Sequence, residues 1–200
     1  MTDLHIDWCS YDAAKYAVEH WHYSETMPSG KTLKIGVWEG DEFIGVVIYS
    51  RGATLNIGEP YNLDQTEVCE LTRVALTDHN TPVSRILSIS RKLLRQKCPG
   101  IELVVSYADP DQNHEGGIYQ ADNWVYEGQM ETETYLKING TLRHRRSCFS
   151  KYGTSSASKL KQKFGADNVE RVPVEGKHKY LKALTDEMHR KIEQLAKPYP

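Results

Sequence analysis

The chain has 200 residues, of which 39% are apolar and 26% charged, with 12 Tyr, 4 Trp and 3 Phe. This length suits one or two domains with a substantial core, and the aromatic content excludes a disordered chain. No stretch approaches the roughly 18 apolar residues of a membrane span. Residues 1–7 lack the basic start and apolar run of a signal peptide, so we expect a cytoplasmic protein.

The cysteines and the charge distribution narrow the class further. The four cysteines form no CxxC pair, which excludes zinc-knuckle and thioredoxin motifs and favours ordinary reduced thiols. The net charge of −2 hides two opposed segments, because residues 1–136 hold 10 Lys and Arg against 21 Asp and Glu, and residues 137–200 hold 15 against 6. Such a basic segment indicates a nucleic-acid contact; the alternative is that it neutralises the acidic part within one fold.

The pattern of residues in the first half of the chain predicts helices and strands that follow one another as in an α/β fold. A helix over 11–21, opened by Ser10, precedes a hairpin with strands at 33–39 and 43–50. A strand over 66–76 is followed by a helix from Pro82 to about Lys97, capped by Thr81, and by a buried strand over 101–108. The crossover predicts that these two strands are parallel. The buried stripe of this helix is expected to contain Ile86, Ile89, Leu93 and Leu94.

The second half predicts the end of this body and a basic extension. A short helix over 117–122 and strands at 124–129 and 133–138 complete a body of residues 1–138. Residues 139–200 form a basic, α-rich C-terminal extension that we expect to pack on the body. It has a helix over 158–164 stopped by Gly165, a strand at 170–174 and a last helix from about Tyr180. The apolar face predicted for that last helix contains Leu181, Leu184, Met188, Ile192 and Leu195.

This order of elements resembles the acyltransferase-like fold, a mixed central sheet flanked by helices. Residues 117–128 (GIYQADNWVYEG) resemble a late segment of that fold, in which a tyrosine acts as a general acid. The resemblance implies coenzyme A binding by the backbone of Val74 and Leu76 and by the helix start at Ser84 and Arg85. Residues 78–85, however, contain no glycine, whereas those enzymes use glycine-flanked amides to bind the pyrophosphate. A helix N-terminus alone can still bind an anion.

Five strings extend the resemblance over most of the chain: HWHYS at 20–24, IGVV at 44–47 with RGA at 51–53, ELTRVA at 70–75, SYADP at 106–110 and HEGGIY at 114–119. Together they are similar to the Mom family of phage DNA-adenine modification proteins. The resemblance implies a transferase that adds a carbamoylmethyl-type group to N6 of adenine in duplex DNA. It also implies protection of phage DNA from restriction in the bacterial cytoplasm, and an association with iron.

Carried over residue by residue, the resemblance places functional groups at His22, Tyr23, Arg73, Asp109 and Tyr119. His22 and Asp109 are expected to ligate iron(II), which binds two nitrogens and one carboxylate on one face. Tyr119 is expected to donate a proton, and Arg73 to anchor the donor or an intermediate. His20 and Asp111 are spare metal-ligand candidates.

Each of these residues also has a structural interpretation. A lone histidine is commonly a satisfied structural residue. Arg73 can form an ion pair with Glu70 or Glu67, and Tyr119 can be a core anchor. Residues 109–111 can form a plain turn with a helix cap, and Gly116-Gly117 either lets a ligand approach the backbone or forms a helix-entry turn.

With this resemblance, we expect the basic extension to bind double-stranded DNA. An adenine whose N6 reacts must leave the base stack, and Trp21, Tyr23 or Tyr107 are candidates to line its pocket. The alternative for 159–163 is a solvated helix face. The residues expected to contact phosphates are Arg143, Arg145, Arg146, Lys151, Lys159, Lys161 and Lys163.

Two further functions compete with this hypothesis. One is a conventional coenzyme A-dependent N-acetyltransferase acting on a protein or small amine, and the other is a DNA-binding module with an inactive transferase body. A carbamoylmethyl product has a carbon–nitrogen single bond at N6, so acyl transfer alone does not account for it. The donor is therefore expected to be acyl-coenzyme A or another activated two-carbon compound, with a redox metal as a candidate for the missing part.

Overall fold

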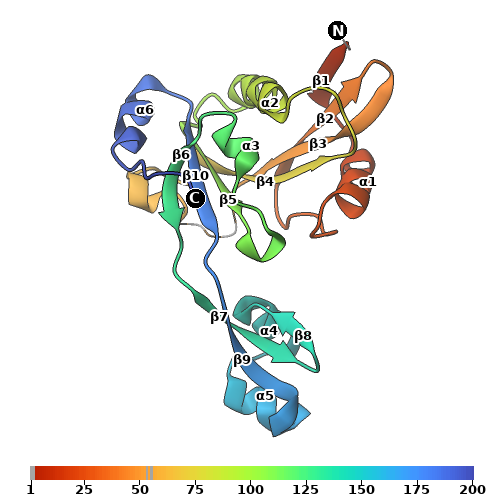
Figure 1. The fold of residues 1–200 in the computed structure, drawn as a ribbon, viewed down its shortest axis with the longest axis vertical. Helices are drawn as coiled ribbons and strands as arrows, with labels where there is room; N and C mark the ends of the chain where they lie inside the picture. The colour runs from red at the N-terminus through yellow and green to blue at the C-terminus, as the bar shows by residue number, and fades with distance from the viewer. Residues whose placement is uncertain (1–2, 53, 55) are drawn as a thin grey trace. The chain divides into compact units, whose positions relative to one another are not determined.

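The computed structural model describes residues 3–52, 54 and 56–200, and its fold is the predicted mixed α/β class with a central sheet flanked by helices. Among these residues, the main sheet has the strand order β1-β2-β3-β4-β5-β10-β6 (Figure 1). The strands are β1 (Leu4–Trp8), β2 (Thr32–Glu39), β3 (Glu42–Ser50), β4 (Val68–Leu76), β5 (Leu103–Ala108), β6 (Val125–Gln129) and β10 (His178–Ala183).

The N-terminal part of the sheet confirms the predicted hairpin and adds a strand that we did not predict. β2 and β3 pair antiparallel, as expected. β1 pairs antiparallel with β2 over five residues and forms the edge of the sheet. Its signal is the short alternation of Leu4 and Ile6, both half-buried, with exposed neighbours, a period that is typical of a half-buried strand.

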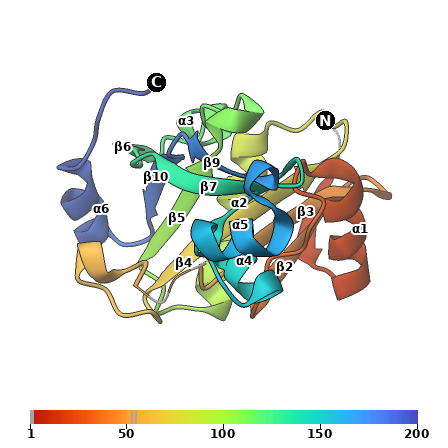
Figure 2. The ribbon, with the colours of Figure 1, turned by 90° about the horizontal axis from the view of Figure 1, so that it is seen from below.

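Helices cover both faces of the sheet. α1 (Tyr11–Trp21) packs Ala14 and Ala17 against Val46 and Ile48 of β3, whereas α2 (Val83–Lys97) packs against a cluster that contains Val47. Because successive strand residues point to opposite faces, α1 and α2 lie on opposite faces. α6 (Asp186–Glu193) lies beside β10 and β6, at the sheet edge away from α1 (Figure 2). None of the helices described here is long and apolar enough to cross a bilayer.

The predicted parallel crossover is present, but β4 and β5 pair along only part of their length. Their register runs from Val68 with Leu103 to Leu71 with Ser106. Beyond Leu71, β4 continues in register with β3, and a bulge leaves Thr72 between the paired residues Leu71 and Arg73. The two strands therefore part at Leu71 and Ser106, and this opening positions the site described below.

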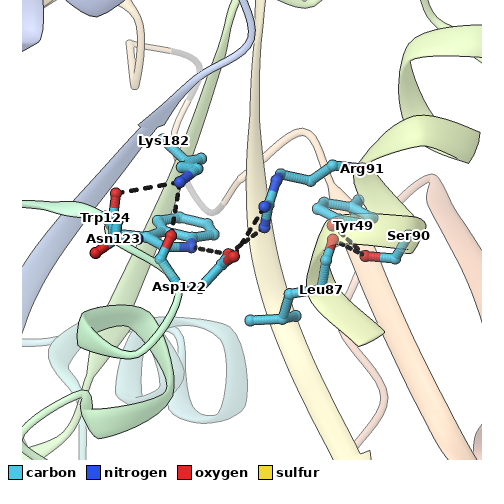
Figure 3. A network of polar contacts seen from close by, with 8 residues as sticks. All are labelled: Tyr49, Leu87, Ser90, Arg91, Asp122, Asn123, Trp124 and Lys182. Atoms are coloured by element: carbon cyan, nitrogen blue, oxygen red, sulfur yellow. Dashed lines mark hydrogen bonds and ion pairs between the residues drawn. The ribbon is translucent and has the colours of Figure 1, made fainter. Parts of the chain in front are cut away.

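The α2 stripe differs from the prediction by including a charged residue. Ile86 and Leu94 are buried as expected, but Ile89 and Leu93 are only half-buried, and Arg91 is buried instead. Arg91 forms a two-pronged ion pair with Asp122, which also accepts a 2.7 Å hydrogen bond from Trp124 Nε1 (Figure 3). Trp124 is 1% exposed, so this network ties α2 to the start of β6 inside the core.

The prediction that the last helix begins at about Tyr180 is wrong, because the helix begins at Asp186. Residues 178–183 form β10, which pairs antiparallel with β5 over six residues, and only Asp186–Glu193 is helical. Tyr180 and Leu181 enter different clusters on the two faces of the sheet. Leu181 and Leu184 match a helical spacing by coincidence, because pairing on β5 and burial on both faces stabilise a strand here.

The chain divides into two compact units, at boundaries that differ from the prediction. The body contains residues 1–128 and 178–200, and an inserted unit contains 129–177. Thus the strand placed in the predicted body, 133–138, belongs to the inserted unit, while β10 and α6 belong to the body. The inserted unit has the sheet β8-β7-β9 and two helices; its elements are β7 (Glu133–Ile138), β8 (Thr141–Arg143), α4 (Arg145–Tyr152), α5 (Ala157–Phe164) and β9 (Val169–Val174).

The Arg91–Asp122 pair gives a direct test of the body's stability. Replacing Asp122 with alanine leaves a buried guanidinium without its carboxylate, and we expect a loss of about 3–5 kcal/mol in the free energy of unfolding. Urea unfolding followed by tryptophan fluorescence measures this loss. Glu19→Ala is the control, because it removes an exposed ion pair with Lys15 and should cost less than about 1 kcal/mol. Equal effects of the two substitutions would contradict this role of Asp122.

Candidate functional site

The polar residues predicted to be functional gather near the point where β4 and β5 part. Arg73 lies on β4, Asp109 follows β5, and His22 and Tyr23 follow α1. Tyr119 lies on α3 (Gly117–Gln120), a short helix after β5. All five belong to the body.

Arg73 connects β4 to the loop that follows α1. Its Nε and Nη2 donate to the Thr26 carbonyl oxygen at 3.3 and 3.1 Å, and its Nη1 donates to the Thr72 carbonyl oxygen at 2.7 Å. Burial lowers the pKa of Arg73, while Tyr23 and Glu70 raise it by charge attraction. The guanidinium therefore fixes the loop that carries His22 and Tyr23. This role differs from the ion pair with Glu70 or Glu67 that we considered from the sequence.

Glu70 is a site residue that was expected from the sequence only as a candidate ion-pair partner of Arg73. Its charge acts on the pKa of Arg73, Tyr107 and Tyr119, so it lies within electrostatic reach of three side chains from separate elements. The available signal was its place in the string ELTRVA, mid-strand, where a carboxylate is costly without partners. Glu70 supplies a carboxylate at this site.

Tyr119 is both a core residue and a hydroxyl held at the opening. It is 7% exposed and packs against Trp124 and Tyr180, each at a ring-centroid distance of 5.1 Å. Ser106 Oγ lies 2.8 Å from Tyr119 OH and 2.7 Å from the Leu71 carbonyl oxygen. A carbonyl only accepts and a serine has one hydroxyl proton, so both contacts are satisfied when Ser106 donates to Leu71 and Tyr119 donates to Ser106. Burial raises the pKa of Tyr119 to about 12, which keeps its proton on at neutral pH.

The backbone conformation and the packing around residue 116 explain why a glycine is present there. Its φ is +85°, and a Cβ atom there would overlap the Tyr180 ring. Its carbonyl oxygen accepts from the Tyr119 amide at 2.8 Å. Of the two interpretations of Gly116-Gly117, Gly116 therefore supports the helix-entry turn, and it brings Tyr119 and Tyr180 together.

His22 and Tyr23 form an aromatic stack whose hydrogen bonds define the state of the imidazole. The two rings stack at 4.4 Å, and Tyr23 also meets the edge of His114 at 5.3 Å. The Ser24 amide donates to His22 Nδ1 at 3.1 Å, and the Ser24 hydroxyl lies 2.9 Å from the same atom. Because a backbone N–H only donates, Nδ1 carries a lone pair and the proton of the neutral ring is on Nε2.

These residues do not fit the predicted iron site. A neutral histidine ligates a metal through its unprotonated nitrogen, which in His22 already accepts from Ser24. Asp109 caps the following turn by accepting from the Asp111 amide at 3.2 Å, as in the turn interpretation. His20 points back along α1, with Nδ1 2.8 Å from the Tyr16 carbonyl oxygen. Within the described residues, no three His, Cys, Asp or Glu side chains are placed to hold a metal ion.

The segment predicted to bind coenzyme A fits only in part. Val74 and Leu76 pair with β3, and their other edge faces the opening beside β5. The predicted Thr81 cap is wrong: Pro82 is the N-cap residue, and the Thr81 amide donates to the Glu39 carboxylate at 2.6 Å, joined by the Asn80 amide at 3.1 Å. The Arg85 amide donates to Pro82. The Glu39 carboxylate thus accepts hydrogen bonds from the Asn80 and Thr81 amides, next to the α2 N-terminus where an anionic ligand could otherwise bind. Coenzyme A binding at Ser84 and Arg85 stays a prediction.

The seven cations predicted to bind DNA all lie in the inserted unit. This unit has 10 Lys and Arg against 5 Asp and Glu, whereas the body has 15 against 22. Except for the half-buried Arg143, the seven are exposed, and they lie mainly on α4 and α5. The ammonium groups of Lys151 and Lys163 lie over the Tyr152 ring at 5.8 and 5.7 Å, beside an exposed Phe149.

The geometry defines a mixed α/β protein with a polar, aromatic cluster where two parallel strands part, and with a basic inserted unit. A model of the Mom protein family matches residues 3–200, and the chain belongs to this family. Among curated proteins it is similar to the methylcarbamoylase mom of Escherichia phage Mu, with 29% identity over 146 residues. That match covers 71% of this chain and 60% of the phage protein, so the chain spans less than two thirds of the relative's length.

A solved structure, a Bacillus subtilis acetyltransferase in complex with CoA, is also similar to this chain. The superposition covers 92% of this chain and 100% of the acetyltransferase, with 11% identity and a TM-score of 0.45. This similarity is too weak to indicate the donor or the activity of this chain.

The hydrogen bonds to Glu39 predict a defined pH dependence. They lower its pKa to about 2, with contacts from Thr81 contributing most and the Asn80 amide next. The stabilisation is therefore present above the unfolded pKa of about 4.3 and is lost as the pH falls towards about 2. We expect Glu39→Gln to be less stable than wild type at pH 7, and this difference to shrink between about pH 4 and pH 2. Urea unfolding at each pH measures it, and Glu42→Gln, at the start of β3, is the matched control.

The contacts of His22 predict which ring nitrogen is protonated. In the neutral ring we expect a proton on Nε2 and none on Nδ1, because Nδ1 accepts from Ser24. Nitrogen-15 NMR of the labelled protein separates the two tautomers, and His22→Gln assigns the signal. A neutral ring with its proton on Nδ1 would contradict this assignment and restore Nε2 as a metal ligand.

Proposed function

We propose that this protein is a DNA-modifying transferase that adds a carbamoylmethyl-type group to N6 of adenine in duplex DNA, acting in the cytoplasm of a bacterial host. Membership of the Mom family supports a transferase of this kind. The main observation behind the proposal is that the basic surface and the polar cluster lie in different units of the chain. A basic unit with an excess of five positive charges is inserted into an acidic body that holds the polar cluster.

The inserted unit is the proposed DNA-binding part. Exposed Lys and Arg side chains release counterions when they contact phosphates, and this gives sequence-independent affinity for duplex DNA. Tyr152, whose ring lies close to the ammonium groups of Lys151 and Lys163, and the exposed Phe149 add apolar surface among these charges. Phosphate contacts position a protein on DNA without reading its bases, which suits an enzyme that selects its target base in a separate site.

The body is the proposed site of the group transfer. In forming the product, N6 makes a bond to the methylene carbon of an activated two-carbon donor, the bond from that carbon to the leaving group breaks, and N6 loses a proton. Glu70 is the proposed acceptor of this proton. Tyr119, which stays protonated at neutral pH, is the proposed donor to the leaving group, and Arg73 the proposed anchor for negative charge.

Nucleoside mass spectrometry of plasmid DNA from expressing cells tests this function. We expect an adenosine adduct with wild type, and roughly 100-fold less or none with Glu70→Gln, because loss of a general base typically costs that factor or more. A triple alanine variant at Lys159, Lys161 and Lys163 should also lose the adduct, but through weaker DNA binding and a smaller salt dependence. Glu70→Gln should bind DNA as wild type does.

Glu67→Gln is the matched control, because Glu67 precedes the same strand and its carboxylate accepts from the Asp64 amide. Full modification is expected with this variant. Unmodified DNA from soluble wild-type protein would overturn the proposal and favour an acetyltransferase acting on a protein or small amine. An adduct that persists in Glu70→Gln would remove Glu70 from the mechanism.

A further inference from the structure

Tyr23 is a large aromatic side chain left exposed beside the polar cluster. It is 47% exposed, although it lies in a segment whose neighbours His22 and Ser24 are half-buried. Its loop is held against β4 by Arg73, which donates to the Thr26 carbonyl oxygen. This exposed aromatic ring offers a flat, apolar surface in the loop that Arg73 holds.

The Tyr23 ring is held from two directions. His22 stacks against its face at 4.4 Å with an interplanar angle of 29°, and His114 meets it edge-on at 5.3 Å and 74°. Ser24 fixes His22 through two contacts to Nδ1, and Asp109 fixes the turn before His114, whose amide donates to the Asp109 carbonyl oxygen at 3.1 Å. Arg73 holds the loop at Thr26. Residues from three separate elements thus orient one ring.

Such a ring suits one class of ligand, an unpaired planar base. Bases stack on aromatic side chains regardless of sequence, and an oriented ring loses little entropy when it binds. An enzyme that reacts at N6 of a paired adenine must take the base out of the duplex and compensate for the lost stacking. Tyr23 offers that replacement stacking in the loop that Arg73 fixes at Thr26, and beside His114 of the segment that leads into α3 and Tyr119.

We propose that Tyr23 is a preorganised stacking platform for an unpaired purine, with His22 and His114 as the positioning residues that hold its ring. The role assigned to Tyr23 is thus stacking, and that of His22 is support rather than metal ligation. This inference rests on the proposed function, because it takes DNA as the substrate.

The chain contains a matched pair for comparison. Tyr16 stacks on His20 at 4.1 Å and 25°, and it is 50% exposed, so it resembles Tyr23 in exposure and in its histidine partner. It lies in the middle of α1, before the loop that carries Tyr23. Tyr16→Ala therefore controls for the loss of an exposed tyrosine stacked on a histidine.

The test compares affinity for two DNA duplexes that differ at one position. One carries an adenine opposite an abasic site, which leaves the base unpaired, and the other carries abasic sites on both strands. Phosphate contacts are the same in both, so the ratio of affinities isolates the contribution of the base. With wild type we expect the adenine duplex to bind on the order of 10- to 100-fold more tightly.

Tyr23→Ala should bring this ratio close to one, whereas Tyr23→Phe and Tyr16→Ala should keep it. A wild-type ratio of one, or equal losses in Tyr23→Phe and Tyr23→Ala, would overturn the stacking role. The readout is binding alone, so it is independent of the transfer reaction. A ratio that depends on Tyr23 in a protein that leaves DNA unmodified would retain the platform and reject only the proposed transfer.

Discussion

The site depends on one hydrogen-bond arrangement at the point where β4 and β5 stop pairing. Their backbone register ends at Leu71 and Ser106, and the Ser106 hydroxyl bonds to the Leu71 carbonyl oxygen there. The same hydroxyl meets Tyr119, so the opening of the sheet and the position of this phenol are fixed together. Two residues beyond, Arg73 fastens the loop after α1. The end of β4–β5 pairing and the positions of Tyr119 and Arg73 are thus fixed by hydrogen bonds at the same point of the sheet.

The tautomer of the His22 imidazole determines whether this ring can act as a metal ligand or as a hydrogen-bond donor. A backbone N–H that donates to His22 Nδ1 leaves the ring with a proton on Nε2, which is a hydrogen-bond donor rather than a metal ligand. Among the described residues, the site is instead built from tyrosines, a carboxylate and a guanidinium. These groups support proton movement, charge stabilisation and stacking, which are the roles that the proposed transfer to an unpaired adenine requires.

Charge is divided along the same line as the fold. The inserted unit carries the basic excess, and the body is acidic apart from local cations such as Arg73. The chain passes between the units twice, at 128–129 and at 177–178, so β10 returns to the body and completes its sheet beside β5. Each unit has its own apolar cluster, so the basic unit and the acidic body are stabilised by separate cores.

The sequence by itself determined the elements whose signals are local: the β2–β3 hairpin, α1 with its Ser10 cap, the β4–α2–β5 crossover and the basic character of residues 137–200. It also indicated His22, Tyr23, Arg73 and Tyr119 through strings that resemble a family. Only the tertiary structure decided that Leu181 belongs to a strand, because pairing with β5 outweighs a helical spacing. It alone showed the inserted unit, the Glu39 contacts at the start of α2 and the Ser24 contact that sets the His22 tautomer. These depend on residues distant in sequence or on the direction of a single hydrogen bond, and neither leaves a periodic pattern in the chain.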